Sequence, residues 1–259
     1  MKKHRIIYLY TVCIIIAFQA CNPKYVPNVI NTPMFTEAGE VNVAVNFGES
    51  GFDPQLSASL TDHFGIMLNG SLSKQTDYSL NASSHRFLEF GAGYYTKSNT
   101  FARFEVYGGY GFGNFKAQHY FTPIYNDSPS YLIKSDVNCN RFFIQPGFGI
   151  ITDYVELSLA SRFVNVNYLS GPDSDNGLRG VPFFFVEPAL TLKAGSKYIK
   201  GVLQVGTSLL LNYNYVGYEY DPFILSLGLQ VKFDTFARKH RKPNYNPEFE
   251  ETDLNSYNL

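Results

Sequence analysis

The sequence predicts an all-β protein, an antiparallel up-and-down transmembrane β-barrel of about ten strands, with eight strands as the alternative. The first observation is the strict alternation from Phe223 to Phe233, where odd positions are large and apolar and most even ones are small or polar. Such alternation indicates a β-strand with two unlike faces, and about ten residues suit a tilted strand that crosses a bilayer. The pattern also recurs along the chain, and short connections alternate with long ones.

Composition excludes several classes of protein. The chain of 259 residues has a formal net charge of −1, and 17% of its residues are aromatic. This near-neutral charge argues against a nucleic-acid partner, because nucleic-acid binders normally carry a basic excess. After the N-terminus no apolar run is long enough for a transmembrane helix, which agrees with strands that turn only one face to lipid.

Residues 1–20 have the pattern of a lipoprotein signal peptide, with a basic start at 2–5 and an apolar run at 6–18. The sequence Phe-Gln-Ala-Cys at 18–21 resembles a bacterial lipobox, in which cleavage precedes a cysteine that becomes diacylated. Lipidation of Cys21 is therefore predicted. The alternative is ordinary signal cleavage nearby, which would leave a free thiol.

Residues 21–38 are predicted to be an extended tether between the lipid and the barrel, because they contain three prolines and no periodicity. Cys13 leaves with the signal peptide and Cys21 carries the lipid, so Cys139 is expected to be a lone thiol in a loop, with no disulfide framework. Residues 234–259 lack alternation and are predicted to be a solvated C-terminal tail.

The predicted barrel covers residues 39–233 and contains about ten alternating segments. Charged residues are absent from the apolar face of every segment. We expect the apolar faces to point outward, because a lumen of about ten strands has little room for so many large side chains. Pro146 and Pro188 fall inside strands, so a bulge or a local break is expected at each. The segments lie near residues 41–47, 55–61, 65–73, 87–95, 102–112, 141–150, 155–163, 183–192, 199–211 and 223–233.

The inward faces are expected to carry charged side chains of both signs. Buried charges need partners, so these side chains are predicted to form a structural ion-pair network that fills the lumen. A selective conduit lined by the same groups is the alternative. The predicted network consists of Glu89, Arg103, Glu105, Arg141, Glu156, Arg162, Glu187 and Lys200.

Short connections near 61–64, 96–100, 152–154 and 193–197 alternate with longer ones near 74–84, 114–140, 165–180 and 212–221. In outer-membrane barrels the short turns are periplasmic and the long loops extracellular. An even strand count then places both termini, with the 21–38 tether and the 234–259 tail, in the periplasm. The aromatic-rich loop 114–140 is a candidate surface for an extracellular ligand.

The sequence contains no motif for catalysis, cofactor binding or metal binding, and we expect no enzyme. Ser84 and His85 form the one pair of interest, but adjacent strand residues point to opposite faces and make a poor dyad. Glycines within 108–113 alternate with aromatic residues, which indicates strand packing rather than a phosphate-binding loop.

The chain resembles the small outer-membrane β-barrel superfamily, in particular lipid-anchored barrels of Bacteroidota-type bacteria. The resemblance covers residues 21–233 and rests on Cys21, Thr-Asp-His-Phe-Gly at 61–65, Phe-Gly-Ala-Gly-Tyr at 90–94, Gln-Pro-Gly-Phe-Gly at 145–149 and the terminal Phe233. It implies a location in the bacterial outer membrane, contact with its lipids, and recognition of the last strand, from Phe223 to Phe233, by the barrel-assembly machinery.

These motifs are general to barrels and imply no activity. We therefore expect a non-enzymatic outer-membrane lipoprotein with a structural or surface-interaction role through its long extracellular loops. The alternatives are a narrow pore for small solutes and an outer-membrane lipid-modifying enzyme built around His85.

Overall fold

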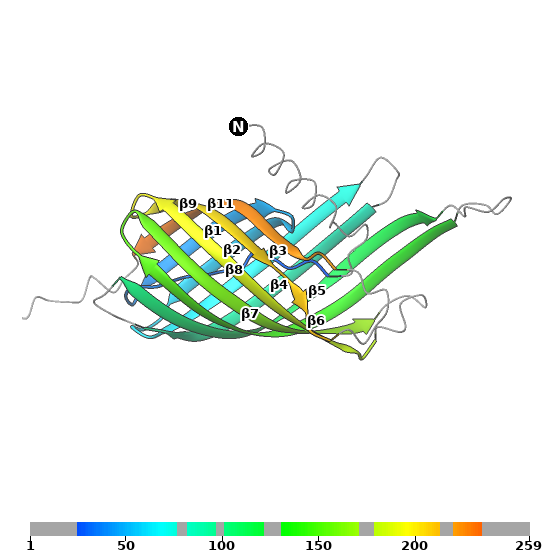
Figure 1. Cartoon of the computed structure of the whole chain (residues 1–259), viewed down its shortest axis with the longest axis horizontal. Helices are drawn as coiled ribbons and strands as arrows, with labels where there is room; N and C mark the ends of the chain where they lie inside the picture. Colours follow the sequence, from blue (N-terminus) through cyan, green and yellow to red (C-terminus); the bar gives the residue numbers. More distant parts are fainter. Residues whose placement is uncertain are drawn as a thin grey trace, which may run out of the picture.

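The computed structural model describes residues 25–76, 82–96, 101–121, 131–170, 179–212 and 220–234, which form a closed antiparallel β-barrel (Figure 1). Within these ranges the regular elements are all strands. They are β1 (Glu40–Gly48), β2 (Gly51–Ser59), β3 (Phe64–Thr76), β4 (Ala82–Tyr95), β5 (Ala102–Phe121), β6 (Tyr131–Ile151), β7 (Val155–Ser170), β8 (Pro182–Gly195), β9 (Ile199–Thr207), β10 (Leu209–Leu210) and β11 (Phe223–Asp234).

Each strand pairs with its neighbours in sequence, and β11 closes the barrel by pairing with β1. The segments β9 and β10 are one strand interrupted at Ser208, because both pair with β8 in the same register. The barrel therefore has ten strands, which confirms the predicted up-and-down topology and excludes the eight-stranded alternative. Closure gives every strand two neighbours, although residues 131–137 at the start of β6 pair with β5 alone.

The outer surface carries the large apolar side chains, as predicted. Leu227 is 66% exposed and Val205 is 52% exposed, while Gln204 and Ser226, one position along their strands, are buried in the lumen. We call this girdle of outward-facing apolar side chains the outer apolar band. At the short-turn end it finishes in exposed aromatic residues: Phe64, Tyr94, Phe101, Tyr154, Tyr198 and Phe233.

The region predicted as a loop at 114–140 is mostly strand, so that prediction is wrong. β5 continues to Phe121 and β6 begins at Tyr131, and the two strands pair along this whole length. The alternation changes sense after Phe112. The outward residues become polar, as at Lys116, and the inward residues become apolar, as at Phe115. Because the outward residues of this section are polar, the apolar alternation predicted an end that is too early for β5 and a start that is too late for β6.

The same inversion occurs on β7. Phe163 faces outward in the outer apolar band, whereas Asn165 and Asn167 are the next outward residues. Inward, Val166 and Tyr168 are buried. Near the long-loop end the exterior of β5 and β7 is thus largely polar, with Leu169 as an exposed apolar exception, and the interior is apolar. The outer apolar band lies on the short-turn side of this section.

Prolines interrupt single ladders without changing the register. At Pro146 the β6–β7 ladder lacks two pairs between Ile144 and Gly147, and at Pro188 the β8–β9 ladder has the gap that separates β9 from β10. Both predicted breaks are confirmed. Pro54 has the same effect on the β2–β3 ladder. A proline lacks the N–H that would face one neighbour, so only the ladder on that side is lost.

Inward glycines make room for inward aromatic rings. A Cβ at Gly109 would lie 2.3 Å from the Phe143 ring and 2.3 Å from the Phe90 carbonyl oxygen, whereas a Cβ at Gly108, on the outer face, meets nothing closer than 3.8 Å. We expect Gly109→Ala to lower the free energy of unfolding by about 1–3 kcal/mol through overpacking. Gly108→Ala is the matched control and should be near neutral in urea unfolding in micelles. Equal losses in the two variants would contradict this packing.

Candidate functional site

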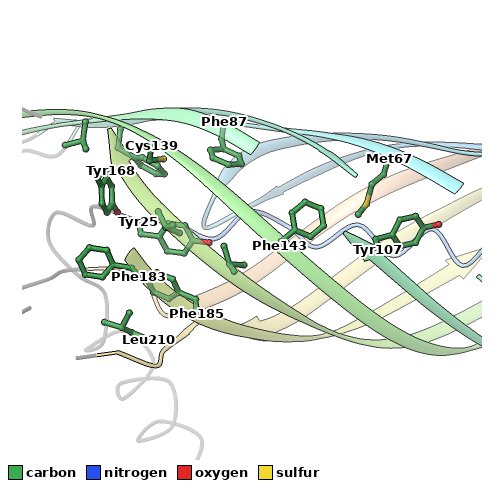
Figure 2. Close-up of a cluster of buried hydrophobic side chains, with 14 of the residues drawn as sticks. Tyr25, Met67, Phe87, Tyr107, Cys139, Phe143, Tyr168, Phe183, Phe185 and Leu210 are labelled. Atoms are coloured by element: carbon green, nitrogen blue, oxygen red, sulfur yellow. The ribbon is translucent and has the colours of Figure 1, made fainter. Parts of the chain in front are cut away.

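The lumen is occupied by the N-terminal segment of the same chain, which we call the N-terminal plug (residues 25–38). It passes between the strands as an extended coil, blue in Figures 1 and 2. Most of its side chains are buried, including those of Tyr25, Ile30 and Phe35. The expectation that residues 21–38 form a tether outside the barrel is therefore wrong for the described part. The segment is extended, as its prolines indicated, but apolar residues such as Ile30 and Phe35 favour burial over exposure.

The N-terminal plug runs the length of the barrel. At the long-loop end, Tyr25 forms a β-bridge with Tyr220 and accepts a 2.9 Å hydrogen bond at its carbonyl from the backbone N–H of Asp221. At the short-turn end, the N–H of Ala38 donates to Asp62 Oδ1 at 3.2 Å. β1 then begins at that same end. The first described residue, Tyr25, thus lies at the long-loop end, whereas the sequence predicted both termini at the short-turn end; the termini themselves lie outside the described residues.

Glutamines on the barrel wall bind the backbone of the N-terminal plug. Gln204 makes two hydrogen bonds to Ile30, accepting from its N–H at 2.7 Å and donating to its carbonyl at 2.8 Å. Gln55 donates to the carbonyl of Val29 at 2.8 Å. Gln145 donates to the carbonyl of Asn31 at 2.7 Å. Closure of the barrel commits the strand backbones to their ladders, so side chains supply the partners that the plug backbone needs.

Charged side chains continue this role toward the short-turn end. Lys193 Nζ donates to the carbonyl of Thr32 at 2.6 Å, and Glu105 Oε2 accepts from the N–H of Met34 at 2.9 Å. Two prolines within the plug lack an N–H, which reduces the number of donors that the lumen must satisfy. The polar side chains of the lumen are therefore complementary to the backbone of the N-terminal plug.

A buried ion-pair network lies near the middle of the lumen. Arg141 Nε donates to Glu89 Oε2 at 2.9 Å, and Arg162 Nε donates to Glu187 Oε2 at 2.8 Å. A contact of 3.3 Å between Arg162 and Glu89 joins the two pairs. All four side chains are 0–1% exposed, and their charges balance. Charge-assisted hydrogen bonds of this kind offset part of the cost of burying ions.

The N-terminal plug is part of this network. Arg162 donates to the carbonyl of Asn28 at 3.1 Å and to its Oδ1 at 2.9 Å, and Arg141 also donates to Oδ1. The hydroxyl of Tyr25 donates to Glu187 Oε1 at 2.6 Å and accepts from Arg141 at 3.1 Å. Asn28 and Tyr25 were not among the residues predicted from the sequence, because a coil has no periodicity that would assign its side chains to a lumen.

The remaining predicted network residues lie nearer the short-turn end, and all are buried. Lys200 pairs with Glu156 at 2.7 Å, and Lys193, which sequence reasoning assigned to a turn, lies 3.6 Å from the same carboxylate. Arg103 donates to the carbonyl of Ala102 at 3.0 Å, next to a polar recess of about 530 Å³ that opens at the short-turn mouth. Six of the eight predicted residues thus form ion pairs with one another.

His85 and Ser84 point to opposite sides of the wall, as expected. The partner of His85 is Ser71 on the neighbouring strand, with 2.9 Å between Nε2 and Oγ. Both side chains are buried, and the ring of Phe115 lies over the imidazole with 5.5 Å between the ring centroids. This pair lies inside the barrel, away from the outer apolar band.

A cluster of buried apolar side chains extends along the lumen, and part of it lies at the long-loop end (Figure 2). Tyr25 stacks on Phe185 with 4.4 Å between ring centroids, and Phe183 and Tyr168 pack beside it. Cys139 belongs to this cluster and is 2% exposed on β6, so its expected place in a loop is wrong.

Within the described ranges, no three His, Cys, Asp or Glu side chains are grouped as metal ligands, and no helix has the length and hydropathy to cross a membrane. No known protein family matches the chain. A comparison with curated proteins gives no match either. The site is therefore defined by its geometry alone: a closed barrel whose lumen is complementary to the first segment of its own chain.

Proposed function

We propose that the protein is a non-enzymatic bacterial outer-membrane β-barrel lipoprotein with a structural or surface-interaction role. The outer apolar band supports the membrane location, because so large an apolar surface is stable in hydrocarbon and unstable in water. A closed barrel also satisfies its backbone groups internally, as any structure in lipid must. Recognition of β11 by the barrel-assembly machinery and lipidation of Cys21 complete the proposal.

The occupied lumen is the observation that best supports the proposed role. The N-terminal plug runs along the lumen, and the ion-pair network and the aromatic cluster pack around it; all three are buried. Their hydrogen bonds link the coil directly to the wall. A resting barrel filled in this way supports a structural or anchoring role over a narrow pore for small solutes.

The paired extension of β5 and β6 is the proposed contact surface for an extracellular ligand. It presents polar groups outward, including an ion pair between Lys116 and Asp136 at 2.8 Å. Asn114 also donates to Asp136 Oδ1 at 2.6 Å. The proposed surface is therefore an ordered pair of strands rather than a free loop, which lowers the entropy lost when a partner binds.

Spin labels test the membrane location. We expect a label at Leu227, replaced by cysteine, to contact acyl chains, because this side chain points outward from the outer apolar band. A label at Asp136, outward on the β5–β6 extension, is the matched control and should report water. Accessibility to oxygen and to a water-soluble relaxing agent distinguishes the two environments. Water contact at Leu227 in a folded, vesicle-inserted protein would refute the proposed location.

The enzyme alternative has its own test. A lipid-modifying reaction at His85 requires substrate to reach the Ser71–His85 pair, which the wall encloses. We expect mass spectra of membrane lipids from deletion and wild-type cells to be identical. A lipid species lost on deletion and restored by the wild-type chain, but not by His85→Ala, would establish the enzyme instead.

A further inference from the structure

We infer that the N-terminal end of the mature chain emerges at the long-loop face, so that the two ends of the protein lie on opposite sides of the membrane. This inference rests on the proposed outer-membrane location and adds a sidedness to it. The N-terminal anchor would lie in the outer leaflet, and the C-terminal tail would lie in the periplasm. The plug and the barrel would then connect an anchor on one side of the membrane with a tail on the other.

The height of Tyr25 in the barrel supports this direction. Its ring packs on Phe185 and on Phe115, with centroid distances of 4.4 Å and 6.5 Å. Phe115 belongs to the section of β5 where the outward side chains, such as Lys116, are already polar. Tyr25 therefore lies at the upper edge of the outer apolar band, or just above it.

Chain length then prevents a return to the other side. Only four residues separate Cys21 from Tyr25 in the sequence. A fully extended chain covers about 3.3–3.6 Å per residue, so Cys21 is within about 14 Å of Tyr25. The apolar band of an outer-membrane barrel is about 25 Å tall. An anchor at Cys21 cannot reach the periplasmic leaflet while the plug occupies the lumen.

The connection to β1 fixes the plug in this orientation. The chain reverses at Gly39, which has a positive φ of 85° and donates from its N–H to the carbonyl of Ser59 at 3.0 Å. Before the reversal, the N–H of Thr36 donates to Glu40 Oε2 at 3.1 Å. The plug therefore runs in the direction opposite to β1, from the long-loop end at Tyr25 to the short-turn end at Ala38.

The ends of the chain differ in this respect. β11 finishes at Asp234 opposite Glu40, at the short-turn end. Lys232 on this strand forms an ion pair with Glu40 at 2.9 Å, next to the point where the plug turns into β1. Residues 235–259 therefore continue from the short-turn face, whereas residues before Tyr25 continue from the long-loop face.

Labelling of intact cells with a membrane-impermeant maleimide tests the inference. The full-length chain would carry one introduced cysteine at a time: Lys24→Cys before the plug, Ser128→Cys between β5 and β6, or Asn255→Cys in the C-terminal region. We expect Lys24→Cys and Ser128→Cys to be labelled in intact cells. We expect Asn255→Cys to be labelled only after the outer membrane is permeabilised. The unaltered chain gives the background from its own cysteines.

The same experiment separates two kinds of failure. If Ser128→Cys also needs permeabilisation, the proposed outer-membrane orientation is wrong. If Ser128→Cys is labelled in intact cells but Lys24→Cys is not, the location stands and the threaded N-terminus is refuted. Each variant is first tested for a folded barrel by its gel mobility with and without heating. A second reporter, an epitope tag inserted after Lys24, must give the same sidedness with an antibody on intact cells.

Discussion

Replacing Arg162 by methionine is expected to lower the free energy of unfolding by about 3–5 kcal/mol, the usual cost of removing one partner from a buried ion pair. Arg162 is fully buried and contacts Glu187, Glu89 and both oxygens of Asn28. Methionine fills a similar volume but donates no hydrogen bond. The variant would leave Glu187 with its charge buried and its main cation missing, and it would remove two of the hydrogen bonds to Asn28 of the plug.

Lys116→Met is the matched control for this prediction. It removes a cation from an ion pair of 2.8 Å whose two side chains are 57% and 53% exposed. Exposed pairs contribute about 0.2–1 kcal/mol, so the expected loss is several-fold smaller. Urea unfolding in micelles, followed by far-UV circular dichroism, measures both variants. Similar small losses at the two positions would show that the central network contributes little to stability.

A double variant tests whether the loss at Arg162 comes from the unpaired carboxylate. Arg162→Met combined with Glu187→Gln removes the stranded charge together with its partner. We expect the double variant to lose less stability than the sum of the two single variants, because the residues share one interaction. Additive losses would indicate that each side chain acts independently, through packing or through the plug.

Alternation was enough to predict the barrel, because lipid-like and lumen-like faces differ at every second residue. The alternation alone assigned Leu227 and Val205 to the outer face and Glu89 and Arg162 to the lumen. The same reasoning located the ladder breaks at Pro146 and Pro188, since a missing N–H has a local and unavoidable effect. Strand ends were predicted less well. After Phe112 the outward residues of β5 are polar, so the apolar alternation disappears from the sequence although the strand continues.

The N-terminal plug left no comparable signal. Its hydrogen bonds join residues far apart in the sequence, such as Ile30 and Gln204, which are 174 positions apart. Irregular coil has no period, and polar wall residues look the same whether they bind water or a backbone. One clue was present. The segment contains large apolar residues such as Ile30 and Phe35, which a solvated tether would not favour.

Deleting residues 25–35 is expected to convert a silent barrel into an ion-conducting one. The full chain should show little steady conductance in planar bilayers, because the plug fills the lumen and binds Gln55, Gln145 and Gln204 on the wall. In the deletion variant these amides would face an empty lumen and bind water instead. A polar, hydrated lumen conducts ions, as in porins. Stepwise conductance should therefore appear only when the plug is removed.

Gln204→Leu provides an intermediate case, since it removes both hydrogen bonds to Ile30 and leaves the plug covalently in place. We expect brief openings, with a conductance between that of the full chain and that of the deletion variant. The hydrogen bonds to Ile30 are lost, while those around Asn28 remain. Circular dichroism and heat-dependent gel mobility must first show that each variant is a folded barrel. Equal conductance in the full chain and the deletion variant would mean that the plug does not seal the lumen. A folded but silent deletion variant would mean that wall side chains such as Phe143 and Tyr107 close the lumen unaided, and that the plug acts only in anchoring.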